Sequence, residues 1–279
     1  MGKRMATTQD LDRRFMVSAA NRPAYKRLIR FLNPPSKLSP ATYEYVEQER
    51  TEGRGRLGQN DFLWRGLVRA VTTVQGDRAY RNICTFPEAD WSFDHIVGLS
   101  GTKRARHLKK LVGENSIYTR HVTQLLYNCG QLGDRRALNR EQREIKQLAS
   151  AQEKVNYFSG GCGKRFKGFG PKYSRNFWLD LDDEHVGAEC FALDSRIQSV
   201  LAVIWSSFEG ENGKRIIKDA VNRDDCYRVI ERALLTIANK AEVTAGFADR
   251  ALYRVLAPKS RERFLCWLRQ GGAFPEELK

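Results

Sequence analysis

The sequence predicts an all-α protein, and three observations lead to this prediction. Apolar residues recur at spacings of three and four along much of the 279-residue chain, as on the buried face of an amphipathic helix. No stretch shows a strong alternation of apolar and polar residues, which is typical of a half-buried strand. In the helix expected after Asp194, six apolar residues form one continuous face: Ile197, Val200, Leu201, Ile204, Trp205 and Phe208. We therefore expect Trp205 to lie in the core.

Residues 1–58 are expected to form a helical extension that precedes the main body of the protein. Apolar spacing predicts one helix over 24–32 and a second, short helix that begins at Ser39. Residues 49–58 are rich in charge and glycine, so we interpret them as a linker. The body is then expected to comprise residues 59–279.

Helical spacing continues through the body. A helix capped by Asn60 or Asp61 carries an apolar face as far as Val71 and ends in a polar turn that contains Gln75. A glycine break is expected at 130–133. A basic helix is expected within 98–111, with Ser100 or Thr102 as its cap. Further helices are expected over 116–127, 134–148, 226–237, 247–256 and 261–268.

Charge and cysteine usage limit the classes of function. Lys and Arg outnumber Asp and Glu by 48 to 33, and the resulting net charge of +15 favours a polyanionic partner, most simply nucleic acid. The sequence has no run of eighteen apolar residues and no signal-type start, so we expect no membrane association. The six cysteines and four histidines show no metal-ligand spacing, which predicts free thiols, no metal site and a cytoplasmic location, at the nucleoid in a prokaryote.

The candidate catalytic residues lie within residues 160–198. Two glycines around one apolar residue let the turn Gly168–Gly170 take positive φ, and Pro171 suits the first turn of a helix. Lys172 is therefore predicted in that first turn, and Asp194, twenty-two positions later, at the N-cap of the next long helix. Each residue alone has an ordinary structural explanation. In combination, we interpret them as an amine nucleophile and its carboxylate partner.

These residues resemble a known family. The segments 167–172 (KGFGPK) and 192–197 (ALDSRI) are similar to the helix-hairpin-helix DNA glycosylase superfamily, and most of all to type-2, archaeal-style 8-oxoguanine DNA glycosylases. A weaker similarity extends over residues 60–256, and the four-cysteine iron–sulfur loop of some superfamily members is missing. The resemblance implies a two-lobed helical fold with a DNA cleft between the lobes. The hairpin, within residues 160–180, would lie at the mouth of the cleft.

The resemblance also implies roles for individual residues. Lys172 would be the nucleophile, and Asp194 would stabilise the cationic sugar as the base leaves. Phosphates of the DNA would be bound by the hairpin and its basic neighbours: Lys164, Arg165, Lys167, Gly168, Phe169 and Gly170. Around the target base, the family places residues that correspond to Gln75, Tyr253 and Lys279.

The implied reaction is removal of an oxidised purine, 8-oxoguanine, from double-stranded DNA by a monomeric enzyme that needs no cofactor. The nucleotide would be flipped out of the duplex. The Lys172 amine would then displace the base to leave an imine, and β-elimination would cleave the strand. Two alternatives stay open. One is a glycosylase for alkylated bases or for modifications of foreign DNA, in a defence role. The other is a non-catalytic hairpin DNA-binding protein, which needs neither Lys172 nor Asp194.

Overall fold

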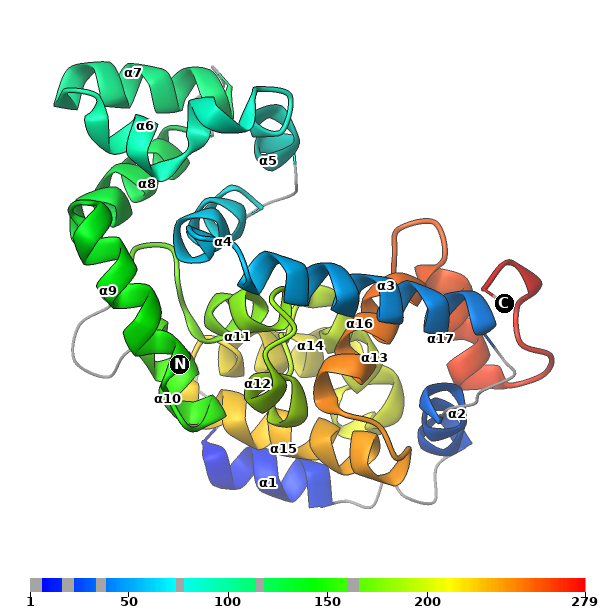
Figure 1. The fold of residues 1–279 in the computed structure, drawn as a ribbon. Helices are drawn as coiled ribbons and strands as arrows, with labels where there is room; N and C mark the ends of the chain where they lie inside the picture. The colour runs from blue at the N-terminus through cyan, green and yellow to red at the C-terminus, as the bar shows by residue number, and fades with distance from the viewer. Residues whose placement is uncertain are drawn as a thin grey trace. The chain divides into compact units, whose positions relative to one another are not determined.

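The computed structural model describes residues 7–16, 23–33, 39–73, 78–113, 118–159 and 166–278 (Figure 1). Within these residues every regular element is a helix and no strand is present, which confirms the predicted all-α class. No helix in this part of the chain is long and apolar enough to cross a membrane. The chain forms two compact units. We call Gly53–Leu181 the central unit, and Met1–Glu52 with Asp182–Lys279 the terminal unit.

The central unit is organised around one buried helix, α4. Its elements in chain order are α4 (Phe62–Thr72), α5 (Arg78–Ile83), the 3-10 helix η2 (Glu88–Trp91), α6 (Phe93–Gly98), α7 (Gly101–Val112), α8 (Thr119–Leu132), α9 (Arg135–Lys146), α10 (Ala151–Ser159) and α11 (Pro171–Leu179). Helix α4 packs against α5, α8, α9 and α11. The helix break predicted at residues 130–133 occurs at Gly133 alone. Gly133, with φ of +73°, ends α8, whereas Gly130 is still part of that helix.

Aromatic rings fill the core between α10 and α11. The ring of Phe158 lies 5.1 Å from that of Phe169, 4.5 Å from that of Phe177 and 5.8 Å from that of Trp178, measured between centroids. These four side chains are at most 2% exposed, and aromatic pairs of this kind contribute roughly 0.5–1.5 kcal/mol each beyond their burial. A Cβ at Gly66 of α4 would overlap the Phe177 ring, so this glycine lets α4 and α11 approach closely.

The terminal unit has a separate core built from both ends of the chain. Its elements are α1 (Thr8–Met16), α2 (Pro23–Leu32), most of α3 (Pro40–Leu57), α12 (Glu184–Glu189), α13 (Ser195–Ile204), η4 (Ser206–Phe208), α14 (Gly210–Ala220), α15 (Asp224–Lys240), α16 (Ala245–Val255), α17 (Arg261–Gln270) and η5 (Glu276–Leu278). Trp205 is 4% exposed, and its ring meets that of Phe15 edge-on at 4.9 Å, which confirms its place in the core. The helix itself ends at Ile204, and the 3-10 helix η4 follows.

Residues 49–58 do not form the open linker that we expected, because α3 continues through Leu57. Each glycine in a helix costs about 1 kcal/mol relative to alanine. Arginine contacts offset this cost: Arg50 pairs with Asp182 at 3.2 Å, and Arg56 donates two hydrogen bonds to the carbonyl of Asp180 at 3.1 and 2.8 Å. The boundary between the two units falls inside α3, whereas the predicted extension ends at residue 58.

Candidate functional site

The turn Gly168–Gly170 and the helix after it lie in the central unit, whereas residues 160–165 of the predicted hairpin lie outside the described residues. Helix α11 begins at Pro171 with Gly170 as its N-cap, so Lys172 lies in the first turn as expected. Gly168 has φ of +94°, a conformation that other residues rarely adopt, and a Cβ there would lie 3.3 Å from Gln124 and from Val71. At Gly170, φ is −119° and nothing lies within 4 Å of an added Cβ. Only the first glycine is therefore required by the turn itself.

A buried asparagine on α8 fixes the hairpin. The side-chain oxygen of Asn128 accepts a hydrogen bond from the Lys167 N–H at 2.7 Å, and its amide group donates to the Lys167 carbonyl at 3.0 Å. Asn128 is 0% exposed, and the Phe169 ring is buried in the aromatic core. The sequence interpretation missed Asn128. A polar residue one helical turn after the buried Leu125 was the signal that could have identified it.

Two lysines flank the turn, and each lies beside an aromatic ring. The ammonium of the exposed Lys167 is 4.3 Å from the centre of the Tyr127 ring. The ammonium of Lys172, whose residue is half-buried, is 4.7 Å from the centre of the Tyr173 ring. Four other residues predicted at the site lie outside the described residues: Gln75, Lys164, Arg165 and Lys279.

In the terminal unit, Asp194 is the N-cap of α13, as predicted. One carboxylate oxygen accepts hydrogen bonds from the N–H groups of Arg196 at 2.9 Å and Ile197 at 3.0 Å. The other oxygen lies 3.5 Å from the Arg196 Nε, and the Asp194 side chain is 15% exposed. The carboxylate is thus held in one orientation while part of it still faces solvent.

Arg196 connects Asp194 with Tyr253, a second residue predicted at the site. Its guanidinium carbon is 3.8 Å from the centre of the Tyr253 ring, and its Nη1 donates to the Tyr253 carbonyl at 3.4 Å. Tyr253 is 48% exposed, so the Arg196–Tyr253 stack offers a flat surface next to a carboxylate. The sequence interpretation gave Arg196 no role, and no local signal pairs it with a residue 57 positions away.

Charged and aromatic groups of α3 and α16 surround this stack. Burial, the Glu49 carboxylate and Tyr253 raise the pKa of Tyr45 to about 12, so its phenol is neutral at physiological pH. The Arg254 guanidinium lies 5.1 Å from the centre of the Tyr45 ring. Arg250 lies 3.8 Å from the Glu49 carboxylate. Two of the cations near Tyr253 are therefore paired with carboxylates, Arg196 with Asp194 and Arg250 with Glu49, whereas Arg254 lies over a neutral ring.

The described site residues fall into two groups, one in each compact unit. Asp194 and Tyr253 are neighbours in the terminal unit, while Lys172 is joined to Lys167 and the glycines by the hairpin of the central unit. The pairing of Lys172 with Asp194 stays a prediction. Among the described residues, no three His, Cys, Asp or Glu side chains are grouped so that they could hold a metal ion. The chain matches no protein-family model, no curated protein and no solved structure.

Proposed function

We propose that this protein is a DNA glycosylase with AP lyase activity, which removes 8-oxoguanine from duplex DNA through an imine on Lys172. One observation carries the proposal: Lys172 lies in the first turn of a helix that begins directly at a fixed Gly-x-Gly hairpin. The resemblance of segments 167–172 and 192–197 to helix-hairpin-helix glycosylases supports it, as does the net charge of +15.

The hairpin would bind one phosphate of the DNA backbone without reading its sequence. Backbone N–H groups and the positive end of the α11 dipole attract a phosphate, and the open space at Gly170 lets it approach. Asn128 and the buried Phe169 hold the turn in place before DNA arrives. Little ordering entropy is then lost on binding.

Lys172 would attack the sugar once the damaged nucleotide is flipped out. The bond from its Nζ to C1′ forms as the bond from C1′ to the base breaks, and the base leaves with the bonding electrons. One Nζ proton passes to the departing base and the other to the ring oxygen O4′ as the C1′–O4′ bond breaks, which leaves the imine. Removal of a 2′ proton then expels the 3′ phosphate and cleaves the strand. The attack needs a neutral amine, and the positive end of a helix disfavours the charged form of a first-turn lysine.

The terminal unit would contribute a carboxylate and a surface for the base. The Asp194 carboxylate, oriented by Arg196 and two N–H groups, would stabilise the positive charge that develops on the sugar. The exposed Tyr253 ring, backed by Arg196, would stack on the flipped base.

Borohydride trapping of the imine tests the proposal. Lys172→Gln is expected to abolish both trapping and strand cleavage, while folding persists because glutamine is a comparable helix former. Lys167→Gln is the matched control, since it removes a lysine from the same hairpin. Because Lys167 is itself an expected phosphate contact, trapping is compared at saturating protein concentration, where this variant should keep it. A trapped adduct in Lys172→Gln would assign the chemistry to another amine and refute the proposal.

A panel of duplexes, each with one modified base, tests the choice of substrate. Excision is expected for 8-oxoguanine. Excision of an alkylated base instead would favour the alternative glycosylase, and DNA binding without excision of any base would favour a non-catalytic hairpin protein.

A further inference from the structure

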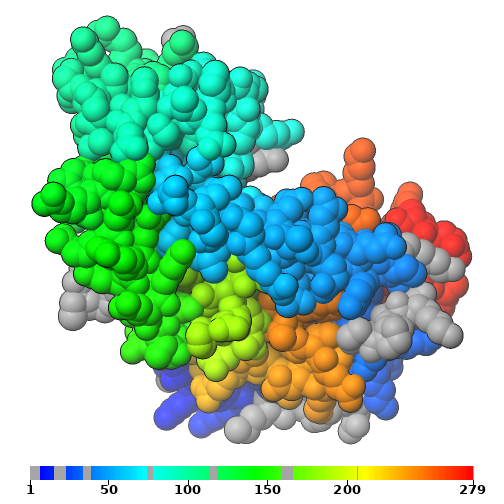
Figure 2. Space-filling view, in the orientation of Figure 1, coloured from blue at the N-terminus to red at the C-terminus, as the bar shows by residue number. Residues whose placement is uncertain are grey.

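The central unit has a second basic surface, formed by one face of α9 and the segment that leads into α4. A groove of about 1180 Å³ lies between them, and we call it the α9 groove. Its wall on α9, which forms part of the surface of the central unit (green in Figure 2), carries Arg136, Asn139, Arg143 and Lys146, all of them exposed. The opposite wall includes Asn60.

The α9 groove and the hairpin lie at opposite ends of α4. The groove is lined by Asp61 and Phe62, where α4 begins. The hairpin contacts the other end, because a Cβ at Gly168 would lie 3.3 Å from Val71. Helix α4 has 11 residues and is therefore about 16 Å long. The two surfaces are separate sites of one unit.

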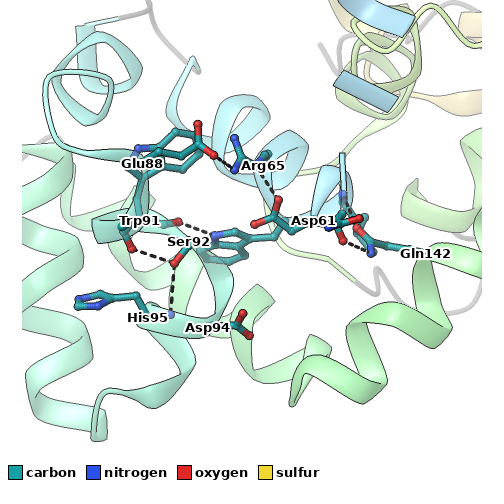
Figure 3. A network of polar contacts seen from close by, with 12 residues as sticks. Asp61, Arg65, Glu88, Trp91, Ser92, Asp94, His95 and Gln142 are labelled. Atoms are coloured by element: carbon teal, nitrogen blue, oxygen red, sulfur yellow. Dashed lines mark hydrogen bonds and ion pairs between the residues drawn. The ribbon is translucent and has the colours of Figure 1, made fainter. Parts of the chain in front are cut away.

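The floor of the groove is held by hydrogen bonds between α9 and the start of α4. The Gln142 amide donates to the Asn60 carbonyl at 2.7 Å and its oxygen accepts from the Leu63 N–H at 3.1 Å. Figure 3 shows Gln142 reaching this point, next to Asp61, which turns toward Arg65. The groove is thus part of the packed structure of the unit.

Both acidic side chains of the groove are already neutralised. Asp61 binds Arg65 at 2.6 Å, and Asp94 receives two hydrogen bonds from Arg135 at 2.8 and 2.7 Å. The Arg135 guanidinium also holds the pKa of Asp94 below its usual value. Three lining cations, in contrast, have no carboxylate partner among the described residues: Arg136, Arg143 and Lys146.

The lining argues against a small apolar ligand and against a protein partner. Small-molecule pockets usually measure roughly 300–1,000 Å³ and are mostly apolar. Here Phe62 is the one large apolar residue of the lining; it is 1% exposed, and the Lys146 ammonium lies 4.7 Å from the centre of its ring. Protein interfaces need an apolar or aromatic centre of the kind that this lining lacks. Cations alternating with side-chain amides instead match phosphate and sugar oxygens.

We propose that the α9 groove binds the phosphodiester backbone of a nucleic acid, as a contact separate from the hairpin. Arg136 and Lys146 are ten residues apart, or about 15 Å along the helix, which corresponds to roughly four or five phosphates of one duplex strand. Arg136 and Arg143 would pair with phosphates in the bidentate manner of guanidinium groups. The side chains of Asn60 and Asn139 would donate to phosphate or sugar oxygens. This contact does not depend on the chemistry of Lys172.

Anisotropy measurements on the full chain with a long, lesion-free duplex test the groove. In Arg136→Gln/Arg143→Gln/Lys146→Gln, Kd at low salt is expected to rise roughly 10- to 100-fold, and the slope of log K against log salt to fall by about 2.7. The control Lys214→Gln/Arg215→Gln/Lys218→Gln removes the same charge from exposed positions of α14 in the terminal unit. It should change Kd by less than about threefold. Equal losses in both variants, or no loss in the first, would overturn the proposal.

Competition experiments identify the ligand class. Unlabelled duplex DNA, single-stranded DNA and RNA should each compete less well for the groove variant than for the wild-type protein. The competitor that binds the wild-type protein most tightly identifies the kind of nucleic acid that the groove binds. If poly-glutamate discriminates the two proteins as strongly as nucleic acid does, the groove binds an acidic polypeptide and the proposal is wrong. Imine trapping at saturating protein concentration should be unchanged in the groove variant. Failure of the groove proposal is thereby distinguished from failure of the lyase proposal.

Discussion

The two compact units carry the charge of the protein very unequally. The central unit, Gly53–Leu181, has 23 Lys and Arg against 11 Asp and Glu, a net charge of +12, whereas the terminal unit has 25 against 22, a net charge of +3. In the terminal unit, carboxylates accompany two of the cations near Tyr253: Asp194 lies beside Arg196, and Glu49 lies beside Arg250. If the protein acts on DNA as we propose, most of the attraction to phosphate would come from the central unit. The terminal unit would then provide a nearly neutral surface with one oriented carboxylate.

Both candidate catalytic residues lie at the start of a helix, but the two helices begin differently. Gly170, the N-cap of α11, has no side chain that could accept a hydrogen bond, and the space around it is open. Asp194, the N-cap of α13, accepts hydrogen bonds from two backbone N–H groups. A helix start attracts negative charge in either case. The start of α11 is therefore suited to binding an external anion, whereas at the start of α13 the Asp194 carboxylate is itself the anion.

The largest expected effect follows from the charge of the central unit. Raising the salt concentration from about 50 to 200 mM should weaken binding to undamaged duplex DNA roughly 10³-fold or more, because several phosphate contacts release counterions. Binding should also be largely indifferent to sequence. Anisotropy titrations over a salt series measure both properties. If affinity hardly changed over this range, the charge difference between the units would have no part in DNA binding.

The next effect concerns the carboxylate of the terminal unit. Asp194→Asn should lower the rate of base excision by about 10²-fold or more, because the charge that stabilises the cationic sugar is lost. The melting temperature should change little, since asparagine caps a helix about as well as aspartate. Single-turnover excision and a thermal melt give the two values.

Asp183→Asn is the matched control for Asp194→Asn. Asp183 caps α12 in the same unit, where its carboxylate accepts a hydrogen bond from the Val186 N–H at 3.1 Å. This variant should keep both stability and excision. Near-normal excision in Asp194→Asn would leave that residue with its capping role alone.

A third effect compares one substitution at the two glycines of the hairpin. Gly168→Ser should lower the free energy of unfolding by about 1–3 kcal/mol, because φ of +94° strains any side chain and the Cβ meets Val71. Gly170→Ser should leave stability unchanged or raise it slightly, since serine is a favoured N-cap. It should nevertheless weaken DNA binding, because its hydroxyl would occupy the place of a phosphate. Denaturant titrations measure the stability of each variant, and anisotropy measures its affinity for DNA. Equal DNA affinity in Gly170→Ser and the wild-type protein would mean that no phosphate binds at the start of α11.

Local rules in the sequence account for what could be predicted. Proline at N1 was enough to place Lys172 in the first turn of α11. The spacing of apolar residues was enough to place Asp194 at the N-cap of α13 and Trp205 in the core. The composition of residues 49–58 indicated a linker, but side-chain contacts made outside that segment override the cost of its glycines.

The remaining features depend on contacts between distant parts of the chain. Asn128 binds the backbone of Lys167 from 39 positions away, and Arg196 stacks on a ring 57 positions away. In the α9 groove, Gln142 joins α9 to the start of α4 across 82 and 79 positions of the chain. Periodicity identifies which face of a helix is buried, but it does not identify which polar residue on that face meets which partner.

The smallest expected effect is a pH dependence of stability that arises in the central unit. His121 on α8 is 3% exposed, and neither ring nitrogen has a hydrogen-bond partner among the described residues. Burial, and then the neighbouring Arg120, lower the pKa of His121 below its ordinary value. Near pH 6.5 and below, the unfolded chain therefore takes up a proton that the folded chain does not, so stability falls as the pH falls until His121 also titrates in the folded state.

His121→Leu should remove this component, whose upper limit between pH 7.5 and 5.5 is about 1.4 kcal/mol, the value for an imidazole that stays neutral in the folded state. Thermal melts over this range should show a smaller loss of stability in His121→Leu than in the wild-type protein. His185→Gln, which removes an exposed histidine of the terminal unit, should follow the wild-type curve. Parallel curves for all three proteins would mean that the loss of stability in acid arises from carboxylates, which both units contain. His121 would then not make the stability of the central unit depend on pH in a way that the terminal unit does not.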